Sequence, residues 1–116
     1  MFYDDDNIFA KIINKKVSTK VILESKYAIA FNDIAPQAPI HILIVPKGKY
    51  IKYDDFINKA GKEEITDFFM LINRLVEMNN LKDTGYRLIS NAGENANQEV
   101  PHLHFHLLAG KNLGKM

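Results

Sequence analysis

Near the carboxyl end of the chain, imidazole and apolar side chains alternate over seven residues, His102-Leu103-His104-Phe105-His106-Leu107-Leu108. Successive side chains of a β-strand point to opposite faces, so an extended chain puts the three histidines on one face and the apolar residues on the other. We therefore expect a strand over residues 100–109 whose apolar face enters the core. A solvated strand face ordinarily carries Thr, Lys, Glu or Ser, and three imidazoles in register instead indicate a chemical site.

The rest of the sequence predicts the elements of one domain over residues 1–116. Apolar residues at helical spacing predict a short helix over 8–13, capped by Asn7 or Asp6, and a long helix over 62–78. Short strands are expected over 21–23, 27–31 and 86–90, and a central strand buried on both faces over 40–45, with loops at 32–39 and 91–97. The sum is an α+β fold, with a sheet of about five antiparallel strands and the long helix on one face. The polar residues expected to face solvent on that helix are Glu63, Glu64, Asp67, Asn73 and Glu77.

Composition excludes several classes of function. The 116 residues contain no cysteine, which removes a disulfide scaffold, a thiol nucleophile, an iron–sulfur cluster and any cysteine-ligated zinc site. The net charge is +1 with both signs mixed along the chain, which argues against binding to nucleic acid or an anionic membrane. The chain opens without a secretory signal and has no apolar run near the ~20 residues that a membrane helix needs, so a cytoplasmic protein is expected.

Two kinds of chemistry fit the histidine face. Adjacent histidines can share a metal ion, and His41 from the central strand could complete such a site. Against this, the Cα atoms of His102 and His106 are about 13 Å apart in an extended chain, and no carboxylate is interleaved with the histidines. Alternatively, neutral imidazole is a nitrogen nucleophile near pH 7, and neighbouring imidazoles can donate hydrogen bonds to phosphate oxygens. This interpretation makes His104 the nucleophile, with His102 and His106 as its supporters, and requires no metal or other cofactor.

The alternating run resembles the His-φ-His-φ-His-φ-φ signature of the histidine triad (HIT) superfamily, where φ is apolar. Residues 8–13 and 30–41, Gly85-Tyr86-Arg87 and Asn91-Ala92-Gly93 are similar to its histidine triad nucleotide-binding (HINT-like) branch. The resemblance implies an antiparallel sheet that homodimerisation extends, and binding of a purine nucleotide of the AMP or GMP type. It also implies hydrolysis at the α-phosphate of nucleoside 5′-phosphoramidates, the purine nucleoside phosphoramidase activity, which releases the nucleoside monophosphate.

The same resemblance assigns roles to individual positions. His104 becomes nucleotidylated, His106 contacts phosphate, and His102 and His41 complete the histidine cluster. Asp33 would hold the ribose, since a carboxylate can accept from two adjacent hydroxyls. The positions that would line the purine slot or touch phosphate and ribose are Ile34, Phe31, Ile12, Asn91, Asn97, Gln98 and Glu99. Taken without the resemblance, Asp33 and Asn91 fit plain turns, His41 fits a core histidine, and the apolar positions fit the core.

Two departures from the family pattern concern the loop before the histidines. Asn97 stands where many relatives have Gly, and Glu99 stands where some carry Ser or Thr. A hydroxyl at the second position would help protonate the leaving group, whereas a carboxylate can do so only with a raised pKa. Two other functions therefore stay open: a dinucleoside polyphosphate hydrolase with the same nucleophile, and a non-catalytic module that binds a nucleotide or a metal ion.

Overall fold

The structure is a computed structural model that describes residues 2–116. Its centre is one five-stranded sheet in the order β1-β2-β3-β5-β4, with every neighbouring pair antiparallel. This confirms the expected α+β fold with an antiparallel sheet. The strands are β1 (Val21–Glu24), β2 (Ala28–Asn32), β3 (Ile40–Pro46), β4 (Arg87–Ile89) and β5 (Phe105–Ala109).

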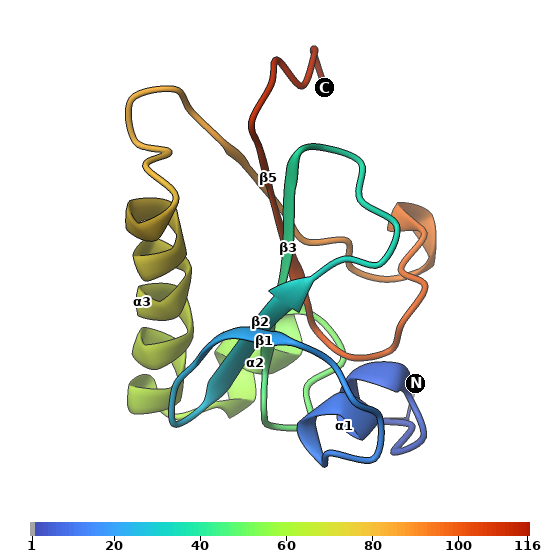
Figure 1. The fold of residues 1–116 in the computed structure, drawn as a ribbon. Helices are drawn as coiled ribbons and strands as arrows, with labels where there is room; N and C mark the ends of the chain where they lie inside the picture. Colours follow the sequence, from blue (N-terminus) through green and yellow to red (C-terminus); the bar gives the residue numbers. More distant parts are fainter. Residues whose placement is uncertain (1) are drawn as a thin grey trace.

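Helices cover both faces of the sheet. The long helix α3 (Lys62–Met78) packs along one side and the short helix α1 (Ile8–Ile13) lies on the other, as Figure 1 shows. The core is divided in the same way. One cluster joins Phe68 and Leu75 of α3 to Leu103 and Leu107, and a smaller one joins Phe9 of α1 to residues of β2 and β3. Two further elements are α2 (Tyr53–Lys59) and a 3₁₀ turn (Glu94–Ala96).

The two helices predicted from apolar spacing have the predicted limits. Asn7 rather than Asp6 caps α1, because its side-chain oxygen accepts the backbone N–H of Ala10 at 2.9 Å. The prediction for β3 is also confirmed, since six of its seven residues are buried and it lies in the middle of the sheet.

The strand expected over 100–109 is wrong in its first half, because β5 begins only at Phe105. Pro101 has no N–H to donate, and the N–H groups of the next two residues turn away from the sheet ladder. That of His102 donates to Val100 at 2.8 Å, and that of Leu103 donates to Tyr50 at 2.8 Å. The alternation of faces survives this change: Leu103 and Leu107 enter the α3 core, while the rings of His102 and His104 contact Phe9 on the α1 side.

Helix α2 was not predicted, and two polar residues of α3 that were expected to face solvent, Glu64 and Asp67, are partly buried. The sequence indicated no helix over α2, because Phe56 is its only buried residue and no apolar period marks it. Asp67 was expected to face solvent, yet it is partly buried. Its carboxylate accepts the Ser25 hydroxyl at 2.5 Å and the backbone N–H of Tyr27 at 3.0 Å, which ties α3 to the turn between β1 and β2.

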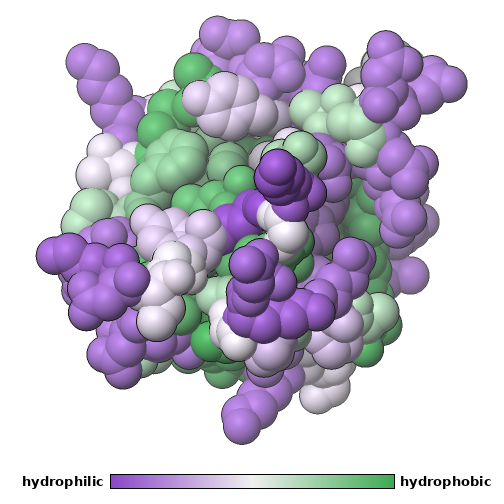
Figure 2. Space-filling model, turned by 90° about the horizontal axis from the view of Figure 1, so that it is seen from above, coloured by the Kyte–Doolittle hydropathy of each residue, from purple (hydrophilic) through white to green (hydrophobic). Residues whose placement is uncertain are grey.

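The surface seen from above (Figure 2) mixes apolar and hydrophilic side chains, and hydrophilic groups project around its rim. Within residues 2–116, no helix has the length and apolar character needed to cross a bilayer. Strands β1 and β4 form the two edges of the sheet. The expected extension of the sheet by a second copy of the chain stays a prediction.

Candidate functional site

A cavity of about 550 Å³ opens on the α1 side of the sheet. We call it the histidine cavity, because His104 and His106 lie in its wall. Its wall also contains eight other positions expected to contact a nucleotide: Ile12, Phe31, Asp33, Ile34, Asn91, Asn97, Gln98 and Glu99. Ile34 is 99% exposed at the cavity mouth, whereas Phe31 is buried. His41 and His102 are not in the wall and contact the site from behind it.

The His102 ring is fully buried and has a hydrogen-bond partner at each nitrogen. Its Nε2 lies 2.8 Å from the carbonyl oxygen of Pro46, and its Nδ1 lies 2.6 Å from the hydroxyl of Tyr3. A carbonyl oxygen only accepts, so Nε2 carries the proton. The backbone carbonyl of His102 in turn accepts the Nδ1–H of His104 at 2.8 Å.

This last bond decides which nitrogen of His104 is free. With its proton on Nδ1, the neutral ring has its lone pair on Nε2. The ring is packed edge-on against Phe9, with centroids 5.0 Å apart, and lies 5.1 Å from the ring of His106. His104 is therefore held in one orientation and one tautomer, which is what a nitrogen nucleophile requires.

His106 is oriented by a second chain of hydrogen bonds. The backbone N–H of Gln37 donates to Nδ1 of His41 at 3.0 Å, so the proton of the neutral His41 ring sits on Nε2. That Nε2 lies 2.8 Å from Nδ1 of His106 and donates to it. Because Nδ1 of His106 accepts this bond, the single N–H of the neutral His106 ring is at Nε2, where it can donate a hydrogen bond into the cavity.

Burial keeps the rings of His102, His104 and His106, which we call the triad, neutral. It lowers the pKa of His102 to about 4 and that of His106 to about 4, with His104 as a further cause in both cases. Burial also lowers the pKa of His104, while the nearby Asp33 and Glu99 carboxylates oppose this shift. At neutral pH each triad ring therefore has one lone pair and one N–H, as the hydrogen bonds require.

Of the two roles that the sequence left open for Asp33, the structure shows the turn role, and the contact with ribose stays a prediction. Oδ1 of Asp33 accepts the backbone N–H of Ala35 at 2.8 Å, which is the turn role. Its Oδ2 lies 3.4 Å from Nε2 of His41, at the histidine cavity. Ligand atoms of Asp33, His41 and His106 lie within 4.8 Å of one another and have the chemistry to hold a metal ion. This set includes one triad histidine and a carboxylate from a different segment of the sequence.

The loop before the histidines is held in place by hydrogen bonds from a polar side chain of its own. The side-chain amide of Gln98 donates to the carbonyl oxygens of Ile51 at 2.6 Å and Val100 at 3.0 Å, and its oxygen accepts the Gly93 N–H at 2.9 Å. Asn97 has φ +57°, a left-handed conformation that Asn adopts more readily than most residues. Glu99 is exposed at the cavity wall.

The sequence did not indicate Tyr3 and Phe9 as site residues. Phe9 was interpreted only as an apolar residue of the first helix, although its ring contacts both His102 and His104. Tyr3 is separated from His102 by 99 residues, and no local pattern connects them.

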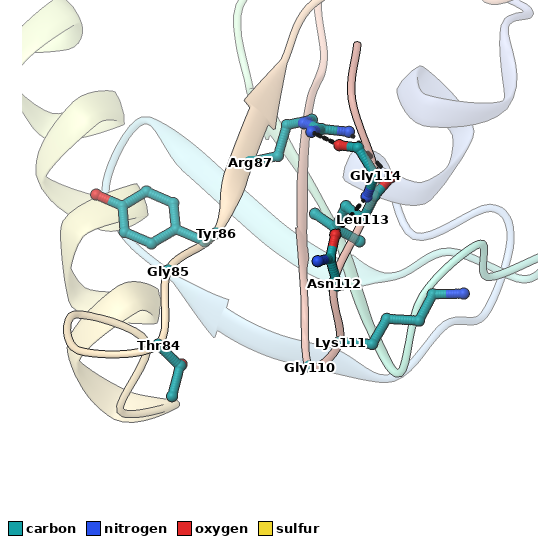
Figure 3. Close-up of a pocket in the computed structure, with 9 residues that line it drawn as sticks. All are labelled: Thr84, Gly85, Tyr86, Arg87, Gly110, Lys111, Asn112, Leu113 and Gly114. Atoms are coloured by element: carbon teal, nitrogen blue, oxygen red, sulfur yellow. Dashed lines mark hydrogen bonds between the residues drawn. The ribbon is translucent and has the colours of Figure 1, made fainter.

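A second cavity, of about 590 Å³, lies between β4 and residues 110–114 (Figure 3). Arg87 holds this terminal segment, because its guanidinium donates to the carbonyl oxygens of Gly114 at 2.6 Å and Leu113 at 3.4 Å. Among residues 2–116, no histidine or carboxylate side chain lies in its wall. Of the two, the histidine cavity is therefore the better candidate for chemistry.

Comparisons with known proteins show what the sequence and the fold of this chain are similar to. The family model of the HIT domain matches residues 14–113. An uncharacterised HIT-like protein of Azospirillum brasilense is 47% identical over 98% of this chain and 93% of its own length. The purine nucleoside phosphoramidase of Escherichia coli strain K12 is 34% identical over 97% of this chain and 93% of its own length. Two solved structures are also similar. A histidine triad protein from Clostridium difficile is 36% identical, with 99% of each chain covered and a TM-score of 0.85. A HIT family hydrolase from Legionella pneumophila Philadelphia 1 is 35% identical, with 94% of this chain and 96% of that chain covered and a TM-score of 0.86.

Proposed function

Since this chain belongs to the HIT-domain family, which includes hydrolases, we propose that it hydrolyses nucleoside 5′-phosphoramidates at the α-phosphate. One observation carries this proposal. The Nδ1–H of His104 donates to the carbonyl oxygen of His102 at 2.8 Å, which leaves the Nε2 lone pair of a cavity residue unprotonated. The relative named as a purine nucleoside phosphoramidase supports the choice of substrate.

The reaction has two steps. Nε2 of His104 attacks the α-phosphorus, a phosphorus–nitrogen bond to the histidine forms, and the bond to the amine breaks. The amine takes up one proton from solvent water and leaves, and the water that later attacks the phosphorus releases one proton to the solvent. Water then attacks the same phosphorus, the bond to His104 breaks, and the nucleoside monophosphate departs with the histidine restored. The carbonyl of His102 stabilises the positive charge that develops on the His104 ring during attack.

Other residues hold the substrate. Nε2–H of His106 donates to a non-bridging phosphate oxygen, and His41 keeps that proton in place through its own bond to Nδ1. The base lies against Ile12, Phe31 and Ile34, and the ribose hydroxyls donate to Asp33. No metal or organic cofactor takes part in these steps.

The charges around the cavity favour a substrate with a single phosphate. Within the described residues, its charged side chains are Asp33 and Glu99, and its wall contains no lysine or arginine. With neutral imidazoles, nothing there neutralises the extra negative charge of a polyphosphate chain. We therefore place a dinucleoside polyphosphate hydrolase second, and a non-catalytic module that binds a nucleotide or metal third.

Single-turnover mass spectrometry with adenosine 5′-phosphoramidate tests the proposal. We expect an adenylyl adduct on His104 in the wild type, and its loss in His104→Ala together with a fall in turnover of roughly 10³-fold or more. Asn73→Ala, on the exposed face of α3, is the control and should keep both the adduct and the turnover.

The same assay separates the alternatives. A dinucleoside polyphosphate is offered beside the phosphoramidate at equal concentration, and the phosphoramidate should turn over faster. Full turnover by His104→Ala, or an untrappable adduct in the wild type, would rule out the covalent mechanism. Equal or faster turnover of the polyphosphate would overturn the choice of substrate while leaving the nucleophile in place.

A further inference from the structure

The segment before α1 is held against the site by its own contacts. Asn7 caps α1 and also donates from its side-chain amide to the carbonyl of Asp4 at 2.7 Å, which closes a turn just ahead of the helix. Asp5 forms an ion pair with Lys49 at 2.8 Å. This turn places Tyr3 edge-on against the ring of His102, with ring centroids 5.6 Å apart.

The direction of the hydrogen bond between Tyr3 and His102 follows from the other nitrogen of the ring. Since Nε2–H of His102 donates to Pro46, Nδ1 of the neutral ring is an acceptor, and the Tyr3 hydroxyl must donate to it over 2.6 Å. Burial raises the pKa of Tyr3, which keeps this hydroxyl protonated. The His102 ring is 0% exposed, so its lone pair would have no solvent to replace the tyrosine.

The ring of His102 matters because its own peptide unit orients the nucleophile. The carbonyl of that unit accepts Nδ1–H of His104, and the N–H of the same unit, from Leu103, donates to Tyr50 at 2.8 Å. This stretch precedes β5, so no strand ladder holds it. The contacts of the His102 side chain therefore share the task of fixing the carbonyl.

We propose that Tyr3 is a positioning residue for His104, acting through the buried ring of His102. The inference rests on the proposed function, in which His104 is the nucleophile. The carbonyl of Pro46 sets the tautomer of His102, Tyr3 holds the rotamer of that ring, and the carbonyl of His102 then fixes the proton of His104 on Nδ1. Tyr3 does not contact the substrate, so its loss should slow the chemical step without weakening substrate binding.

Tyr3→Phe removes only the hydroxyl and is the direct test. We expect kcat for adenosine 5′-phosphoramidate to fall about 3- to 10-fold with KM unchanged within twofold. Tyr53→Phe is the matched control, since Tyr53 is exposed on α2 and its hydroxyl has no hydrogen-bond partner among residues 2–116. This control should keep the wild-type kcat.

Nitrogen-15 NMR of the histidine rings gives a second readout that a general loss of stability would not move. In the wild type, Nδ1 of His102 should show the shift of a hydrogen-bonded imine. In Tyr3→Phe it should move toward the shift of a free imine, and a second tautomer of His104 should become populated. The spectra are recorded well below the melting temperature of each variant.

The outcomes separate this inference from the proposed function. The inference is overturned if Tyr3→Phe keeps the wild-type kcat and the wild-type ring shifts, whether or not its melting temperature falls. If the wild type turns over no phosphoramidate, the proposed function fails. The NMR spectra then still decide whether Tyr3 sets the state of His102.

Discussion

At the scale of single residues, the site is organised by where protons sit. Three backbone groups each fix one imidazole: the N–H of Gln37 fixes His41, the carbonyl of Pro46 fixes His102 and the carbonyl of His102 fixes His104. The ring of His41 then sets the proton of His106. Backbone groups cannot change their donor or acceptor character with pH. The tautomers are therefore anchored in the fold itself and do not depend on neighbouring titratable groups.

Asp33→Asn tests the contact with ribose. The substitution keeps an oxygen that can accept the Ala35 N–H, so the turn should survive, but it removes the charge that would accept the ribose hydroxyls. We expect KM for adenosine 5′-phosphoramidate to rise about tenfold, in line with ~1.4 kcal/mol for a charge-assisted hydrogen bond. The 2′,3′-dideoxy analogue is the control substrate, and its KM should be the same for both proteins. An equal rise for both substrates would show that Asp33 acts only through the turn.

The alternation of His102, His104 and His106 was enough to predict a chemical site and to place these rings on one side of the sheet. The hydrogen bonds of the His102 and His106 rings could not be predicted, because each depends on an atom far away in sequence, and the local bond of His104 to the carbonyl of His102 requires the departure from strand geometry that the sequence did not indicate. Pro46 is 56 residues from His102, and His41 is 65 residues from His106. A periodic pattern specifies a face, whereas a tautomer depends on tertiary contacts.

At the scale of elements, the site depends on how the ends of β3 and β5 meet. Gly110 follows β5 with φ +97°, and a Cβ on it would lie 2.8 Å from Cβ of Pro39, just before β3. Gly110→Ala should therefore lower the free energy of unfolding by about 2–3 kcal/mol, through both backbone strain and this clash.

Gly85→Ala is the matched control for this prediction. Gly85 has a similar φ of +96° but no atom within 4 Å of the added Cβ, so only the backbone strain of about 1–2 kcal/mol applies. Urea unfolding of both variants measures the difference. Equal losses would show that the contact with Pro39 adds nothing.

Elements that bury an apolar stripe were predictable and the others were not. The limits of α3 follow from its buried stripe, which includes Phe68, Ile72 and Leu75. Helix α2 buries only Phe56, and its remaining signals are charges: acidic residues in the first turn and Lys59 in the last. The late start of β5 follows from Pro101, whose missing N–H is visible in the sequence but whose effect depends on the partners available to its neighbours.

At the scale of the whole molecule, burying neutral histidines links stability to pH. The pKa of His102 is about 4 in the folded chain against 6.5 for the free side chain, so the unfolded chain binds its proton first. Stability should be full above pH 6.5 and fall progressively as the pH drops toward 4, by ~3 kcal/mol for His102 alone.

Urea unfolding at pH 7.0, 5.5 and 4.5 measures this dependence. His102→Gln, compared over the same pH values, should show a flatter dependence because it has no imidazole to protonate at that position. A midpoint for the wild type that is the same at pH 7.0 and 4.5 would contradict the prediction.

The hydrogen bond between Tyr3 and His102 joins residues 99 positions apart in a chain of 116. Because closing a loop of this length costs backbone entropy, the contact depends on the sheet and helices between the two residues being in place. The orientation of the His102 ring is therefore a property of the whole fold and of no shorter segment.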